Sequence, residues 1–254
     1  MSDGAVYVYG VAAAGKSRLS VSTRGVEAAR IRTVEHDGLL ALVSDVRGES
    51  LAAAREVRAH WRVLDEASEG ATVLPVRFGT VMEDEDAVRA RLLEPNADHL
   101  RELLRDLDGR VQLTLKGDYD EQLLMRQVVE ESDAVAGLRD RLRSVPAEAA
   151  YYERIRLGEM VAAQVDRRRA EDTRVALETL EPLAVAAREE DATRPDAALS
   201  LSFLVERERI PQFNEGVRKL AEHFGDRISL RYVGPLPPYS FADIELDPEA
   251  AAWA

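Results

Sequence analysis

The chain has 254 residues, 46% of them hydrophobic and 32% charged, with no cysteine and a formal charge of −13. The length allows one large domain or two ordinary ones, and the missing thiols exclude disulfides, thiolate catalysis and the usual structural zinc sites. The acidic balance argues against a nucleic-acid binder, which needs a basic face, and against adhesion to anionic lipid. The N-terminus carries no signal-peptide pattern and no run approaches the roughly 20 apolar residues of a membrane span, so we expect a cytoplasmic protein.

The first half of the chain alternates strand and helix patterns. We predict, in chain order, strands over residues 5–11, 33–45 and 72–78 and helices over residues 51–68 and 83–107. The second strand pattern is a hairpin, because Asp37 and Gly38 form a typical two-residue turn. Pro95 removes a helical N–H and should split the second helix in two.

A break at Gly109 separates two predicted domains, residues 1–109 and 110–254, the latter ending in a tail over about 234–254. After the break we predict strands over residues 111–115, 185–189, 199–205 and 227–233 and helices over residues 120–143, 146–180 and 211–224. This order, β-α-β-β-α-β, is that of a ferredoxin-like split βαβ domain. The fold class expected for the whole chain is therefore α+β in two domains.

The sequence GPLPPYSF at residues 234–241, here called the strap, is the most distinctive stretch of the chain. Its prolines fix φ and remove N–H donors, so it should run as a stiff, extended connector, and its aromatic residues offer large apolar anchors. The strap either seals a domain edge or binds a partner. The candidate tail-docking or partner-binding residues are Gly234, Pro235, Pro237, Pro238, Tyr239 and Phe241.

The strap also carries a family resemblance. It resembles the C-terminal signature of the gas vesicle accessory proteins GvpF and GvpL, and three further motifs agree in order: VYVYGV at 6–11, GLLALVSDV at 38–46 and TVLPVRFGTV at 72–81. Leu236 departs from the pattern, which has a bulky aromatic there. The resemblance implies a non-enzymatic accessory protein of the cytoplasm and the gas vesicle, without cofactor or metal. It would bind the small hydrophobic shell protein and other accessory proteins and aid nucleation or assembly of the shell. The motifs do not distinguish GvpF from GvpL.

The octet GVAAAGKS, from Gly10 to Ser17, matches the phosphate-loop pattern GxxxxGK[ST] and follows a predicted strand. A phosphate loop must open into a helix whose first N–H groups hold the phosphate. The residues that follow, RLSVSTRG at 18–25, are β-branched and serine-rich and do not predict a helix. The context of the octet thus does not support a phosphate loop, and a P-loop nucleotide-binding protein is kept only as an alternative. A second alternative is a small-ligand sensor that uses the ferredoxin-like domain.

His60 and Arg77 are the candidate structural polar residues. His60 lies on a predicted helix without a nucleophile nearby in the sequence, so we interpret it as a partly buried histidine bonded to the main chain rather than as a catalytic base. Arg77, between Val76 and Phe78, is the basic residue that we expect inside the fold, paired with a carboxylate that helps to orient the two domains. An anionic ligand at Arg77 is the alternative.

Overall fold

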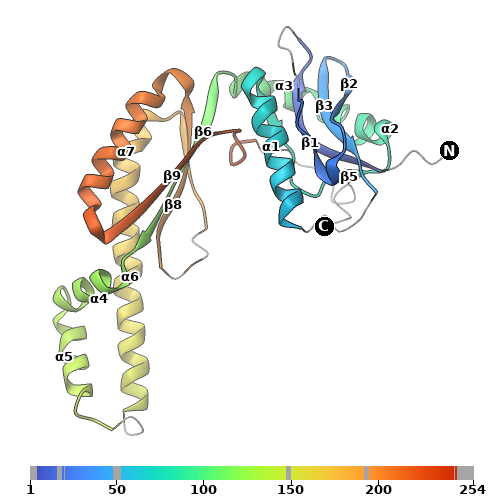
Figure 1. Cartoon of the computed structure of the whole chain (residues 1–254). Helices are drawn as coiled ribbons and strands as arrows, with labels where there is room; N and C mark the ends of the chain where they lie inside the picture. The colour runs from blue at the N-terminus through green and yellow to red at the C-terminus, as the bar shows by residue number, and fades with distance from the viewer. Residues whose placement is uncertain are drawn as a thin grey trace. The chain divides into compact units, whose positions relative to one another are not determined.

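The computed structural model describes residues 5–15, 19, 21–47, 53–146, 150–191, 194, 196–242 and 244. These residues fall into two compact units, one within 1–112 and 235–254 and the other within 113–234 (Figure 1). Each unit combines a β-sheet with helices, so the predicted mixture of helices and strands is confirmed. The described part of the tail lies in the first unit, whereas the predicted range 110–254 placed it in the second domain.

The sheet of the first unit is built around its first strand. Its members are β1 (Val6–Ala13), β2 (Arg32–His36), β3 (Leu39–Asp45), β4 (Val73–Pro75) and β5 (Val81–Met82), in the order β2-β3-β1-β4 with β5 also paired to β1. All of these pairings are antiparallel. The hairpin between β2 and β3 turns at Asp37 and Gly38, whose φ angles are 45° and 76°, as the two-residue turn requires. Pro75 lies in β4 at the end of the strand order, where a missing N–H is tolerated.

Helices cover both faces of this sheet. They are α1 (Ala54–Gly70), α2 (Glu85–Ala87), the π-helical turn η2 (Val88–Leu93) and α3 (Ala97–Asp106), with a short 3-10 turn, η1, at Val26–Ala28. Figure 1 shows α1 in front of the sheet and α3 behind it, and both contact β1 and β4. The predicted helix over 83–107 is interrupted around Pro95, as expected, because that residue cannot continue the helical hydrogen bonds.

The second unit contains the other sheet and its helices. These elements are β6 (Arg110–Tyr119), α4 (Glu121–Glu130), α5 (Asp133–Leu142), α6 (Tyr151–Leu180), β7 (Ala186–Glu189), β8 (Ala197–Glu206), α7 (Ile210–Phe224) and β9 (Ile228–Leu236). The strand order is β7-β8-β6-β9. The predicted helix over 120–143 is two helices, because Ser132 interrupts it and accepts a hydrogen bond from the Val135 N–H as the cap of α5.

Aromatic packing joins the helices of this unit to its sheet. Phe203 of β8 and Phe213 of α7 are fully buried, with ring centroids 5.1 Å apart. A buried ion pair adds a polar connection: Asp172 of α6 accepts from Arg227 and, at 2.7 Å, from the hydroxyl of Tyr119. None of the helices in the described part of the chain is long and apolar enough to cross a membrane.

Candidate partner-binding site

Three residues singled out in the sequence line one cavity of the first unit. His60 of α1, Arg77 after β4 and Tyr239 of the strap meet there, around a volume of about 420 Å³. The other lining residues are Trp61, Pro75, Val76, Phe78, Ala242 and Ile244. Because most of these side chains are apolar or aromatic, the cavity suits an apolar side chain better than a charged ligand.

His60 is held in the neutral form by its surroundings. Only 1% of the residue is exposed, and its Nδ1 lies 3.0 Å from the Tyr7 hydroxyl, which itself accepts from the Gly79 N–H at 3.0 Å. The imidazole and the phenol hydroxyl thus share a buried hydrogen bond. Burial lowers the pKa of His60 to about 4. The partner is a side chain and not the main-chain group that we expected.

Arg77 is exposed, which corrects the prediction that it lies inside the fold. The chain turns directly after it: Thr80 donates to the Arg77 carbonyl through its main-chain N–H and, at 2.8 Å, its hydroxyl, and Gly79 takes a φ of 90°. This turn directs the flanking Val76 inward and leaves the Arg77 side chain at the cavity rim. Among the described residues, no carboxylate pairs with its guanidinium.

The strap begins inside the last strand. β9 continues through Gly234 and the exposed Pro235 to Leu236, and Gly234 has a φ of 142°, which L side chains rarely adopt. After β9 the chain bends instead of staying extended. Pro237 and Pro238 are buried.

The bend is closed by main-chain hydrogen bonds within the strap. Tyr239 donates to the carbonyl of Pro237, and the half-buried Phe241 donates to that of Pro238. Ser240 donates to the side chain of Gln112 at 2.8 Å. These bonds fix the main chain around Tyr239.

Trp61 is a lining residue that was not among the candidate residues of the sequence. It is 38% exposed, and its ring centroid lies 4.0 Å from that of Tyr239. The Tyr239 hydroxyl is buried, without a hydrogen-bond partner among the described residues, and burial raises its pKa. The strap thus completes an aromatic wall, and neither Trp61 nor Tyr239 shows this in the local sequence.

The octet has a packing role in its described part. Gly10 belongs to β1 and lies opposite Pro75 of β4, and a Cβ on it would approach the Leu74 carbonyl oxygen to 2.7 Å. The glycine is therefore required for close strand packing. Lys16 and Ser17 lie outside the described residues. Residues 10–13 are in a strand rather than in a loop, and no α-helix begins among the described residues between 19 and 47.

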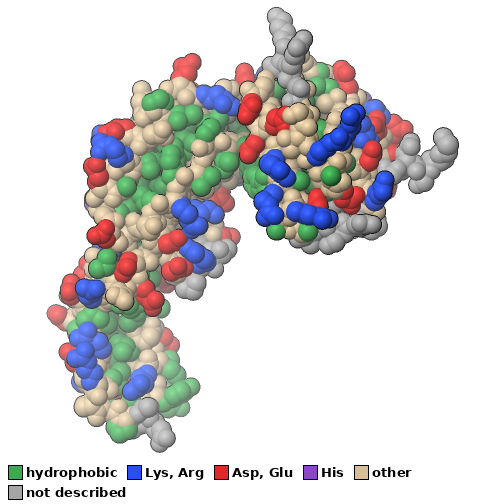
Figure 2. All heavy atoms as spheres, in the orientation of Figure 1, with side chains coloured by type: hydrophobic (Ala, Val, Ile, Leu, Met, Phe, Trp, Pro, Cys, Tyr) green, Lys and Arg blue, Asp and Glu red, His purple; other side chains and the backbone are tan. Residues whose placement is uncertain are grey.

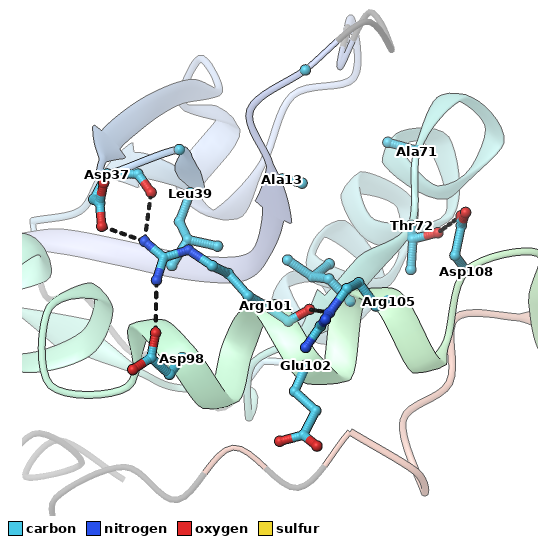
Figure 3. A pocket seen from close by; sticks show the side chains of 13 residues that line it. Ala13, Asp37, Leu39, Ala71, Thr72, Asp98, Arg101, Glu102, Arg105 and Asp108 are labelled. Carbon is cyan, nitrogen blue, oxygen red and sulfur yellow. Dashed lines mark hydrogen bonds and ion pairs between the residues drawn. The ribbon is translucent and has the colours of Figure 1, made fainter.

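A second cavity, of about 910 Å³, lies where β1 ends and is shown in Figure 3. Its charged lining residues are Asp37, Asp98, Glu102, Asp108, Arg101 and Arg105. Arg101 points between two carboxylates, donating to Asp98 at 3.0 Å and to Asp37. The described lining carries four carboxylates and two guanidinium groups, and this negative balance disfavours a nucleotide phosphate. Nowhere in the described ranges do three histidine, aspartate or glutamate side chains gather as metal ligands.

Comparison with known proteins shows the family of the chain. Residues 5–243 match the family described as "Gas vesicle synthesis protein GvpL/GvpF". Gas vesicle protein F of Streptomyces sp. (strain CB03234) is 35% identical over 93% of this chain and 99% of its own length. Gas vesicle protein L of Haloferax mediterranei is 25% identical over 87% of this chain and 73% of its own length. The crystal structure of GvpF from Anabaena sp. PCC7120 is similar with a TM-score of 0.82 and 26% identity, over 96% of this chain and all of that one. The chain therefore belongs to the GvpL/GvpF family of gas vesicle proteins.

Proposed function

We propose that this protein is a non-enzymatic accessory protein of gas vesicle formation that binds the small hydrophobic shell protein and aids its nucleation or assembly. A subunit that packs into a gas-tight wall exposes apolar surface before assembly and aggregates readily. A strongly acidic partner keeps such a complex soluble, and the charge of −13 suits this role. The protein would act in the cytoplasm and at the vesicle, together with other accessory proteins.

The observation that carries the proposal is the aromatic cavity in a chain of this family. Trp61, Phe78 and Tyr239 wall it, and an exposed Arg77 lies at its rim. An apolar cavity with an aromatic wall is typical of the centre of a protein interface, where a few buried anchors supply most of the affinity. Arg77 would bond polar groups of the bound segment at the rim.

The second unit is the part of the chain that the ligand-sensor alternative would use. We propose that its β-α-β-β-α-β order and its strand order β7-β8-β6-β9 form a ferredoxin-like split βαβ domain, enlarged by α4 and α5. A cavity of about 570 Å³ in this unit is lined mostly by apolar parts of α4, α5 and α6. Gln122, Arg126, Glu130 and Arg139 also line it, but a mostly apolar lining suits an apolar side chain better than a polar small ligand.

Co-purification tests the proposal. The tagged chain is co-expressed with the shell protein, and the shell protein retained from the soluble fraction is quantified after washes at about 0.1 M and about 0.5 M NaCl. Apolar contact is little affected by salt, so we expect retention at both concentrations. Trp61→Ser should reduce the binding free energy for the shell protein by about 2 kcal/mol, a roughly thirtyfold loss of affinity that is typical of an aromatic anchor, and so lower retention.

Tyr152→Ser is the matched control. Tyr152 is 81% exposed and lies on α6 of the second unit, so its loss removes an aromatic side chain without touching the cavity. Retention by this variant should equal that of the unchanged protein. Equal retention by the Trp61 and Tyr152 variants, or complete loss at the higher salt concentration, contradicts binding at the aromatic cavity.

A further inference from the structure

Five arginines surround a concavity of the first unit that is separate from the aromatic cavity. Arg24, Arg30, Arg47, Arg55 and Arg62 line a volume of about 780 Å³ between the segment around η1, the end of β3 and the first half of α1. Basic side chains, drawn in blue, gather over and beside α1 on the face seen in Figure 2. A basic concavity of this size is unexpected in a chain with a charge of −13.

Most of these guanidinium groups have no carboxylate partner among the residues that the structure describes. The three carboxylates of the lining are Glu27, Asp45 and Glu56. Glu56 pairs with Arg55 at 2.6 Å, and Asp45 pairs with Arg32, outside the concavity, at 2.8 Å. In the part of the chain that the structure describes, no ion pair neutralises the side chains of Arg24, Arg30, Arg47 and Arg62, all of which are exposed.

Buried polar groups hold the η1 segment that lines the concavity. Glu56 is 4% exposed and accepts from the Glu27 N–H at 2.8 Å, and the buried Tyr9 hydroxyl accepts from the Val26 N–H at 2.8 Å. These bonds hold Glu27 and Ala28 at φ angles of 52° and 55°. Left-handed conformations are uncommon in residues other than glycine and gather at binding sites.

Gly25 lets this segment lie directly on the sheet. A Cβ on Gly25 would come within 2.1 Å of the Tyr9 hydroxyl oxygen. The η1 segment is therefore fixed in one conformation, and the arginines on both sides of it, Arg24 and Arg30, are carried at fixed main-chain positions.

We propose that this concavity binds an acidic segment of a partner protein. Arginine pairs with a carboxylate through two parallel hydrogen bonds, and unpaired exposed arginines spread over a concavity match a run of aspartate and glutamate side chains. A single phosphate would occupy only one point of such a lining. A nucleic acid longer than the concavity is disfavoured by the net charge of −13 of the chain. The inference goes beyond the proposed function, because it concerns a different surface and a partner of different chemistry.

Fluorescence anisotropy with a labelled twelve-residue glutamate peptide tests the inference. We expect saturable binding that weakens steeply as NaCl rises, and no binding of the corresponding glutamine peptide. The combined change Arg24→Gln, Arg30→Gln and Arg47→Gln should weaken binding at least about tenfold, since each exposed arginine–carboxylate pair contributes modestly.

The control removes the same number of positive charges elsewhere. Arg154, Arg156 and Arg167 are exposed on α6, and Arg154→Gln, Arg156→Gln and Arg167→Gln together should leave the affinity within about twofold. Circular dichroism verifies that both triple variants are folded. Absence of binding, equal loss in both variants, displacement of the peptide by millimolar inorganic phosphate, or tighter binding of a twelve-nucleotide thymidine strand overturns the proposal. None of these results depends on the shell protein.

Discussion

The buried His60 should make the stability of the first unit depend on pH. Its pKa is about 4 in the folded protein and about 6.5 in the unfolded chain, because burial opposes the imidazolium. As the pH falls, the unfolded chain therefore takes up this proton first. The contribution of neutral His60 to the free energy of unfolding is therefore complete above about pH 6.5 and is lost as the pH falls to 4. A difference of 2.5 pKa units corresponds to about 3 kcal/mol in full, and to about 2 kcal/mol between pH 7 and pH 5.

Urea denaturation of the unchanged protein and of His60→Asn measures this effect. The unfolding of the first unit is followed through the fluorescence of Trp61, whose ring centroid is 6.4 Å from that of His60. We expect the variant to be less stable at pH 7. Between pH 7 and pH 5, however, its free energy of unfolding should fall by about 2 kcal/mol less than that of the unchanged protein, since the contributions of the carboxylates cancel in the comparison. His223→Asn, at an exposed position of α7, should show the unchanged pH dependence. If the free energy of unfolding of His60→Asn depends on pH as steeply as that of the unchanged protein, the proton uptake does not belong to His60.

Three further changes test the packing described above. Gly10→Ala should lower the urea midpoint, since its Cβ would lie 2.7 Å from a main-chain oxygen. Gly158→Ala on α6, where no atom lies within 4 Å of the added Cβ, is the control and should raise the free energy of unfolding by about 0.5–1 kcal/mol. A gain in stability at both positions contradicts the strand contact. Asp172→Ala leaves Arg227 without its carboxylate and should destabilise the second unit by about 3–5 kcal/mol, which hydrogen exchange of that unit measures; unchanged protection contradicts the buried pair. Tyr239→Ala should lower the free energy of unfolding of the first unit by about 2 kcal/mol, measured by the same urea titration, and an unchanged titration would show that the strap does not stabilise that unit.

Local sequence patterns predicted the elements well where a local rule determines them. The turn at Asp37 and Gly38 placed a hairpin correctly, because its backbone angles select these residue types. Pro95 interrupted a helix for an equally local reason. The two-residue strand β5 was missed, since a strand of that length has no periodicity, and the division of 120–143 into two helices depends on the cap at Ser132.

Three residues of the cavity were singled out in the sequence, but their arrangement could not be predicted from it. His60, Arg77 and Tyr239 line one cavity, although they are separated by up to 179 positions along the chain (239 − 60). The exposure of Arg77 depends on a hydrogen-bonded turn, and the contact of Tyr239 with Trp61 depends on the strap returning to the first unit. Neither follows from periodicity, because both are set by contacts between segments that are distant in sequence.

The two proposed surfaces share α1, yet binding at each should depend differently on the salt concentration. Trp61 of this helix lines the aromatic cavity, and the next residue, Arg62, lines the arginine concavity. Apolar burial at the first surface is nearly independent of ionic strength, whereas exposed ion pairs at the second are screened as the Debye length shrinks to about 3 Å at 1 M salt. A protein with both surfaces can hold an apolar client firmly while it exchanges an acidic partner rapidly. The buried Val63 and Leu64 pack α1 rigidly against the core, which keeps both surfaces in place when either is empty. Raising the salt concentration should therefore release the acidic partner first.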